Sequence, residues 1–160
     1  MKALVVFYSR TGNTRKVAGS IASELKCDIE EIIDTKNRSG IFGYMLAGMD
    51  SSLKKSSTIK ELQKDTSSYD LVIIGSPVWA WNVPAPLRAY LSKEKNNLKK
   101  IAFFCTMDGN DSSGLFGEMK KLAGKEPIRM LDVRSSEVKD ENYLGKVGEF
   151  VDYLSSALKK

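Results

Sequence analysis

The sequence predicts an α/β protein built on a doubly wound, five-stranded parallel sheet with helices on both faces. Three observations lead to this prediction. Short apolar runs of strand length alternate along the chain with segments that repeat apolar residues at helical spacing. The strand-like runs are continuously apolar, as expected of parallel strands that are covered on both faces. No linker, repeat or low-complexity stretch divides the sequence, so we expect one domain over residues 1–160.

Five apolar runs are the expected strands, because each is short and contains β-branched or aromatic residues. Four of them are well defined, and the last is weaker. In chain order they cover residues 2–8, 28–33, 71–75, 101–106 and 127–133.

The expected helices lie between these runs and after the last one. Apolar residues recur every three or four positions over 17–25, 87–91, 115–122 and 143–158. Pro84 and Pro86 precede the apolar positions of the second helix, which is consistent with a helix start because proline is tolerated in the first turn. Gly124 is expected to end the third helix. Residues 39–60 have a weaker pattern, from which we expect a short helix followed by a loop.

Composition narrows the function classes. No apolar run approaches the ~20 residues of a membrane-spanning helix, and the first run is too short for a signal peptide, so we expect a cytoplasmic protein. The net charge is +5, but the lysines occur as scattered pairs without interleaved aromatics, so no specific nucleic-acid partner is expected. The sequence has no histidine, and Cys27 and Cys105 lack metal-ligand spacing; we therefore predict no metal site and no catalytic side chain.

The first candidate site loop follows the first expected strand, because ligands of doubly wound sheets bind beyond the carboxyl ends of the strands. It reads Ser9-Arg10-Thr11-Gly12-Asn13-Thr14 and opens a helix. The N-terminus of a helix has unpaired N–H groups and a partial positive charge, which together favour a phosphate. Simple capping by Asn13 or Thr14 would explain one such polar residue but not five in six.

The second candidate loop follows the third expected strand and contains two tryptophans and three prolines. It covers Pro77, Val78, Trp79, Ala80, Trp81 and Asn82 and continues to Pro86. A single loop tryptophan is usually a packing anchor. Two tryptophans opposite a phosphate site favour stacking of Trp79 or Trp81 on a flat ligand.

The third candidate loop follows the fourth expected strand and covers residues 106–114, with Phe116 just beyond. Alone, this polar segment is an ordinary turn into a helix. Beside the other two loops, the N–H groups of Thr106, Met107, Asp108 and Gly109 could hydrogen-bond the rim of a planar heterocycle.

Other phosphate-handling sites fit the first loop poorly. It lacks the spacing and the lysine of a P-loop, and it has one glycine where a dinucleotide fingerprint has three. A phosphoryl-receiver domain would need acidic residues where this chain has Ser9 and Arg10. A low-molecular-weight phosphatase would need a cysteine in this loop, and Cys27 and Cys105 lie elsewhere.

These motifs resemble those of the flavodoxin family over nearly the whole chain. The first loop is similar to the family's [ST]-x-T-G-N-T phosphate loop. Gly75-Ser76-Pro77-Val78-Trp79 and Cys105-Thr106-Met107-Asp108-Gly109 look like the second and third flavin loops of its divergent bacterial and archaeal branch, and residues 40–48 also resemble that branch. No long insertion interrupts the last expected strand, as in short-chain members.

The resemblance implies a flavodoxin-like domain that binds FMN. Its phosphate would be held by Ser9, Thr11, Gly12, Asn13 and Thr14, with Arg10 beside them. Residues 77–82 would pack against the isoalloxazine ring, and residues 106–109 would line the pyrimidine edge of that ring.

Three features depart from the family pattern. Flavodoxins proper are acidic and dock on redox partners through that charge, whereas this chain is basic. No glycine occurs between Ser76 and Gly109, where many flavodoxins have one beside flavin N5. The tyrosine that usually stacks on the outer ring face has no clear equivalent, and Trp81, Phe116 or Tyr44 could take its place.

Two functions remain open. The first is an electron-transfer protein that exchanges electrons with a redox partner protein. The alternative is an NAD(P)H-dependent oxidoreductase that reduces quinones, flavins or nitro compounds through the same FMN. The cofactor does the chemistry in both, and the short single domain favours the carrier modestly. Both a monomer and a homodimer are compatible with the sequence.

Overall fold

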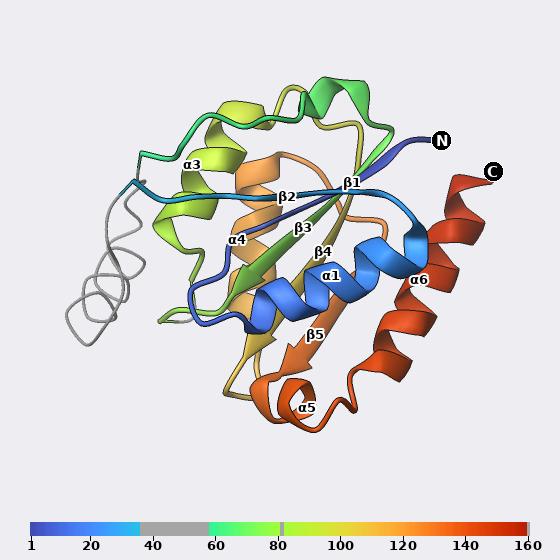
Figure 1. Cartoon of the computed structure of the whole chain (residues 1–160). Helices are drawn as coiled ribbons and strands as arrows, with labels where there is room; N and C mark the ends of the chain where they lie inside the picture. The colour runs from blue at the N-terminus through green and yellow to red at the C-terminus, as the bar shows by residue number, and fades with distance from the viewer. Residues whose placement is uncertain (36–57, 81, 160) are drawn as a thin grey trace.

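The computed structural model describes residues 1–35, 58–80 and 82–159 (Figure 1). Trp81, Tyr44 and most of the expected segment 39–60 lie outside these residues. The strands are β1 (Ala3–Phe7), β2 (Asp28–Glu31), β3 (Leu71–Pro77), β4 (Lys100–Met107) and β5 (Met130–Arg134). The described helices are α1 (Asn13–Leu25), α3 (Ala85–Glu94), α4 (Ser113–Ala123), α5 (Ser135–Lys139) and α6 (Leu144–Leu158), with a 3-10 turn at Thr66–Ser68.

The predicted doubly wound parallel sheet is confirmed. Its strands run in the order β2-β1-β3-β4-β5, and every neighbouring pair is parallel. The strand order reverses between β1 and β3, which is the point where ligands bind in open α/β sheets. In Figure 1 the carboxyl ends of β3, β4 and β5 point toward the lower edge of the molecule, where the loops into α1, α3 and α4 also lie.

Helices cover both faces of the sheet, as predicted. Successive residues of β1 alternate between the two layers, with Val5 and Phe7 on the α1 and α6 side and Leu4 and Val6 on the α3 and α4 side. Each layer is a separate apolar core of fully buried aliphatic and aromatic side chains. Because the central strands are buried on both faces, their sequences are mostly apolar, with polar residues only toward their ends at Ser76, Lys100 and Thr106.

The two edge strands differ from the prediction of continuously apolar runs. In β5, Leu131 and Val133 are buried while Met130, Asp132 and Arg134 are exposed, and β2 is mostly half-buried. The physical reason is that an edge strand lies beyond the helices that cover the sheet centre. The predicted fifth run begins at residue 127, three residues before the observed strand β5.

Helix α5 was not predicted from the sequence. It has five residues and follows β5 directly. The Glu137 side chain accepts a hydrogen bond from the backbone N–H of Arg134 at 2.8 Å, which caps the helix start. The pair Ser135-Ser136 followed by Glu137 was the available signal for this turn.

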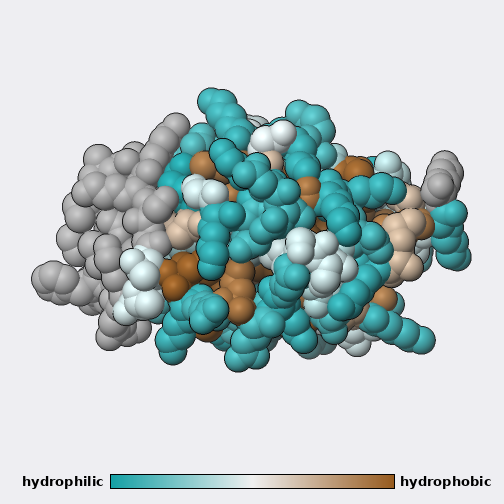
Figure 2. Space-filling view, turned by 90° about the horizontal axis from the view of Figure 1, so that it is seen from above, coloured by the Kyte–Doolittle hydropathy of each residue, from teal (hydrophilic) through white to brown (hydrophobic). Residues whose placement is uncertain are grey.

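The end of the sheet opposite these loops is polar. Figure 2 views the molecule from above Figure 1 and shows a mostly hydrophilic face. Exposed Lys95, Lys99 and Lys100 lie in or beside the loop that enters β4. Lys125, from the loop that enters β5, donates hydrogen bonds to the carbonyl groups of Leu98 and Lys99. Within residues 1–35, 58–80 and 82–159, no helix is long and apolar enough to cross a membrane.

Candidate functional site

Three loops that follow neighbouring strands meet at the carboxyl end of the sheet. Phe7 of β1 pairs with Gly75 of β3, and Pro77 of β3 pairs with Thr106 of β4. The loops after β1, β3 and β4 therefore start side by side. This arrangement brings together the three segments that the sequence singled out.

The loop between β1 and α1 is shaped around Gly12. Gly12 has φ +102°, a conformation that residues with a side chain rarely adopt. Its N–H donates to the Ser9 hydroxyl oxygen at 3.1 Å, and its carbonyl accepts the N–H of Lys16 at 3.0 Å as the first bond of α1. As the N-cap residue, Gly12 has no side chain with which to cap the helix.

The first turn of α1 consequently offers donors to an anion. The N–H groups of Asn13, Thr14 and Arg15 come before the first intrahelical bond and have no partner within the helix. Thr11 is exposed, whereas Arg10, Gly12 and Asn13 are half-buried. The Arg15 guanidinium lies beside this loop and is paired with Glu31, with Nη2 at 2.6 Å from Oε1. The backbone dipole supplies the positive end of the site, and the charge of Arg15 is balanced by Glu31.

Thr14 is placed differently from the other loop residues. Its side chain is buried, with 1% of its surface exposed, and its Oγ1 lies 2.7 Å from Oγ1 of Thr106. Thr106 is 4% exposed and is the last residue but one of β4. A hydrogen bond between side chains therefore joins the first and third loops beneath the site.

The second loop is fastened to the same corner. The N–H of Val78 donates to the carbonyl of Thr106 at 2.9 Å, and the N–H of Asn82 donates to the carbonyl of Trp79 at 2.9 Å. The Trp79 ring meets the buried Tyr8 ring edge-on, with centroids 5.3 Å apart. Trp79 is half-buried and packs on the core, while Ala80 is exposed at φ +48°. Part of the Trp79 side chain therefore serves as a packing anchor, which is the usual role of a tryptophan in a loop.

The third loop leaves β4 after the buried Met107. Asp108, Gly109 and Asn110 are exposed, and Asp111 accepts the N–H of Ser113 at 2.9 Å. The Ser135 hydroxyl donates to the carbonyl of Met107 at 3.4 Å, which ties the loop to the corner between β5 and α5.

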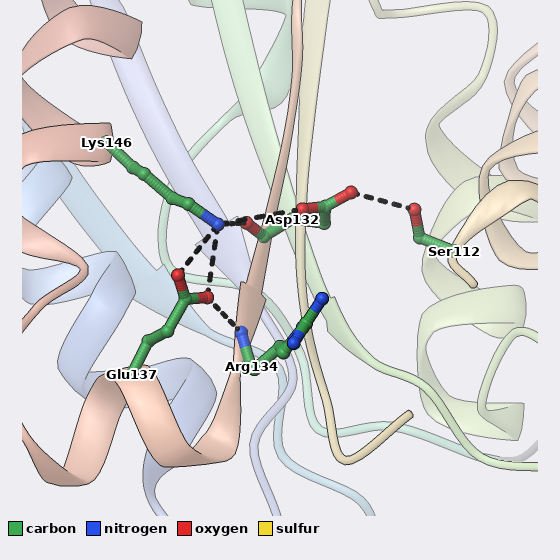
Figure 3. A network of polar contacts seen from close by, with 5 residues as sticks. All are labelled: Ser112, Asp132, Arg134, Glu137 and Lys146. Atoms are coloured by element: carbon green, nitrogen blue, oxygen red, sulfur yellow. Dashed lines mark hydrogen bonds and ion pairs between the residues drawn. The ribbon is translucent and has the colours of Figure 1, made fainter. Parts of the chain in front are cut away.

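A polar network continues from this loop to the last helix (Figure 3). Ser112 donates to Asp132 Oδ2 at 3.2 Å, and Lys146 Nζ lies 4.0 Å from the other oxygen of that carboxylate. Lys146 also pairs with Glu137 at 2.9 Å. Hydrogen bonds from the Arg134 N–H and, to a smaller extent, from Lys146 lower the pKa of Glu137. These contacts link the start of α4 to β5, α5 and α6.

A buried ion pair lies between the helices that follow the second and third loops. Arg88 of α3 places Nη1 at 3.0 Å from Glu118 Oε1 of α4, with side-chain exposures of 7% and 13%. The buried Nε and Nη2 atoms of Arg88 have no hydrogen-bond partner among the described residues. Sequence reasoning missed this pair, because nothing in the sequence distinguishes these two charges from surface charges.

Both cysteines are poor nucleophiles in this fold. Burial raises the pKa of the Cys105 thiol to about 12 and that of Cys27 to about 11. Thiolate is the reactive form of cysteine, so a thiol with such a pKa reacts slowly near neutral pH. Cys105 is fully buried at the end of the central strand β4 and serves as core packing.

A groove of about 600 Å³ lies beside the third loop, between α4 and the uncovered face of β5. Phe116 and Met130 form its apolar part, and the carboxylates of Asp111 and Asp132 line its rim together with Lys120. Lys120 is paired with Glu126 at 3.1 Å. The groove is therefore a poor place for a polyphosphate.

A family model described as Flavodoxin matches residues 2–132. The chain resembles a flavoprotein from Lactobacillus acidophilus NCFM solved in complex with FMN, with 28% identity, coverage of 87% of this chain and 97% of that chain, and a TM-score of 0.72. No curated protein matches the sequence.

Two further structures are similar in fold. A flavoprotein from Bacteroides eggerthii DSM 20697 has 20% identity, covers 92% of this chain and 98% of its own, and gives a TM-score of 0.68. Oxidised flavodoxin 2 from Bacillus cereus has 19% identity, covers 98% of this chain and 99% of its own, and gives a TM-score of 0.64.

Proposed function

The chain belongs to the flavodoxin family, and on that premise we propose that it binds one FMN non-covalently and exchanges electrons through it with a redox partner protein. The observation that carries the proposal is the uncapped N-terminus of α1 behind Gly12, next to the loop that holds Trp79. The FMN bound by the Lactobacillus acidophilus relative supports this choice of flavin. FMN, when bound, supplies an isoalloxazine ring that accepts and returns electrons.

The phosphate end of the site would be formed mainly by backbone. The N–H groups of Asn13, Thr14 and Arg15 point along the start of α1, and a phosphate there meets the positive end of the helix dipole. The exposed Thr11 hydroxyl and the half-buried Asn13 amide are further donors. Ser9 acts indirectly, because its hydroxyl already accepts the N–H of Gly12 and fixes the loop.

The ring end would lie between the second and third loops. Pro77, Val78 and Trp79 are half-buried there, and Trp79 is held by its contact with Tyr8. Exposed Asp108 and Gly109 leave backbone N–H groups available to the rim of the ring. These residues orient the ring and shield part of it from water, which is the protein's share of the chemistry.

The charges around this end are mixed despite the net charge of +5. On the third-loop side of the described residues, Asp108 and Asp111 are exposed carboxylates, whereas the exposed Asp132 lies 4.0 Å from Lys146 and shares β5 with the exposed Arg134. The lysines Lys95, Lys99 and Lys100 lie at the opposite end of the sheet. The positive total therefore does not describe the surface that a partner would meet near the flavin.

The groove between α4 and β5 lies beside the third loop, where an NAD(P)H-dependent enzyme would need room for its dinucleotide. Its carboxylates, Asp111 and Asp132, would repel the phosphates of a dinucleotide. This repulsion supports the carrier over the reductase.

Anaerobic mixing separates the two functions. The FMN-loaded protein is expected to stay oxidised when NADH or NADPH is added, and to be reduced once a flavodoxin reductase is supplied. The photoreduced protein should then pass electrons to cytochrome c, a basic one-electron acceptor. Rapid bleaching of the flavin by NAD(P)H alone, with reoxidation by a quinone, would instead establish the reductase.

Replacing Gly12 with alanine is expected to weaken FMN binding at least tenfold. A side chain at φ +102° is strained by about 1–3 kcal/mol, so the loop would move away from the geometry that presents the first N–H groups of α1. The added methyl group itself meets Arg15 Nη1 only at 3.7 Å, so strain rather than a clash is the cause. Quenching of flavin fluorescence on titration measures the affinity.

The matched control is Gly19→Ala, in the middle of α1. A methyl group there meets nothing within 4 Å, and alanine favours helix. FMN affinity should be unchanged in this variant. Equal affinity in wild type and Gly12→Ala would show that the conformation of the loop does not govern binding.

A further inference from the structure

We propose that Thr106 is a positioning residue for the phosphate end of the FMN site, acting through its hydroxyl bond to Thr14. This inference rests on the proposed function and deepens it. The resemblance to flavodoxins implies that Thr106 lines the pyrimidine edge of the ring. Its hydroxyl, however, is directed to Thr14 in the first turn of α1, at the phosphate end of the site.

The contact is short, buried and long-range. The two Oγ1 atoms lie 2.7 Å apart, and the residues are 92 positions apart in the sequence. Thr14 is 1% exposed and Thr106 is 4% exposed, so water cannot easily replace either partner. A buried hydroxyl left without a hydrogen-bond partner destabilises the protein, because it has given up its contact with water.

The bond reaches across the strand that separates the two residues. Thr106 is the last residue but one of β4. Thr14 is in the first turn of α1, the helix that follows β1. In the sheet, β3 lies between β1 and β4. The Thr106 carbonyl meanwhile accepts the N–H of Val78 from the second loop. Thr106 therefore contacts both other loops, the second through its backbone and the first through its side chain.

The consequence for the site follows from the position of Thr14. Its N–H is one of the three donors at the start of α1, and its side chain is held from below. Fixing that side chain fixes the direction in which the neighbouring N–H groups point. Donors that are already oriented bind an anion without a further ordering cost. The effect should be confined to the phosphate, because loss of the hydroxyl leaves the backbone contact between Thr106 and Val78 at the ring end unchanged.

The test compares FMN with riboflavin, which has the same ring and no phosphate. Thr106→Val keeps the shape of the side chain and removes the hydroxyl. It is expected to raise the Kd for FMN about tenfold and to leave the Kd for riboflavin within twofold of wild type. Thr106→Ser retains a hydroxyl and should restore most of the FMN affinity. Fluorescence titration measures both constants, and thermal unfolding checks that each variant is folded.

A second variant keeps the test decisive if Thr106→Val does not fold. Thr14→Val removes the other end of the same bond and should give the same loss, selective for FMN. Where both single variants fold, the double variant should bind FMN no more weakly than the weaker single variant, because each change removes one shared interaction.

Several outcomes would overturn the inference. Equal losses for FMN and riboflavin would place the effect of Thr106 at the ring or in the fold as a whole. Unchanged FMN affinity in Thr106→Val would show that the bond has no part in binding. Wild-type protein that binds neither flavin would refute the proposed function itself, and the inference with it; the two failures are thus distinguishable.

Discussion

Gly75→Ala is expected to lower the free energy of unfolding by about 3 kcal/mol, which is the largest loss that we expect in this chain from the addition of one methyl group. Gly75 lies in the central strand β3, opposite Phe104 of β4. A Cβ atom built on Gly75 would meet three atoms of the Phe104 ring at 2.0, 2.4 and 2.6 Å. That ring is fully buried in the core beside α1 and α6, so it cannot swing into solvent.

Urea unfolding followed by circular dichroism measures this loss. The control is Gly117→Ala, because a methyl group on that glycine of α4 meets nothing within 4 Å and should be neutral or slightly stabilising. A double variant, Gly75→Ala with Phe104→Leu, should lose less than the two single variants together, since leucine leaves room for the methyl group. A loss below about 1 kcal/mol for Gly75→Ala would contradict the close packing between β3 and β4.

Glu118→Leu is the second large effect, with an expected loss of about 3 kcal/mol. It would leave the Arg88 guanidinium buried without its carboxylate partner, and two of its nitrogen atoms already have no hydrogen-bond partner among the described residues. A buried charge without a partner is costly, whereas a buried ion pair adds little compared with apolar side chains. Arg88→Met combined with Glu118→Leu should therefore be about as stable as wild type, or more stable.

The ion pair between Lys120 of α4 and Glu126, which follows that helix, provides the matched control. Glu126 is 80% exposed, so Glu126→Leu should change the free energy of unfolding by less than about 0.5 kcal/mol. Denaturant midpoints for the three variants test the prediction. A double variant that is less stable than Glu118→Leu alone would show that Arg88 finds other stabilising contacts in this core.

The order of the elements and the positions of the loops could be predicted from the sequence because they depend on local patterns. Val5, Ile73 and Phe103 belong to runs that are apolar on both sides of the strand rather than at alternate positions, and such runs are typical of central parallel strands. The anion loop could be identified because it too has a local pattern, namely Gly12 with polar residues around it. Once the strands are parallel, the loops after β1, β3 and β4 must lie at one end.

Contacts between distant polar residues could not be predicted in the same way. Thr14 and Thr106 are common residue types at ordinary loop positions, and nothing local indicates that their hydroxyls meet in a buried bond. Arg88 and Glu118 likewise have the sequence signature of surface helix residues. Burial of such groups depends on the packing of α3 against α4, which becomes known only with the tertiary structure.

The two tryptophans illustrate an intermediate case. The sequence indicated that one of them would face a flat ligand without indicating which. The edge-on contact of Trp79 with Tyr8 accounts for part of the Trp79 surface as packing. Trp81 lies outside the described residues, so the choice between the two rings stays a prediction.

The most direct test of the central claim is the absorbance spectrum of the purified chain after reconstitution with FMN and desalting. The account predicts bound flavin, with bands near ~375 and ~450 nm, at about one FMN per chain. It also predicts that inorganic phosphate at high concentration competes with FMN, because the first N–H groups of α1 hold the phosphate. Flavin that is removed completely by desalting, with no change in its spectrum or fluorescence on mixing, would contradict the account.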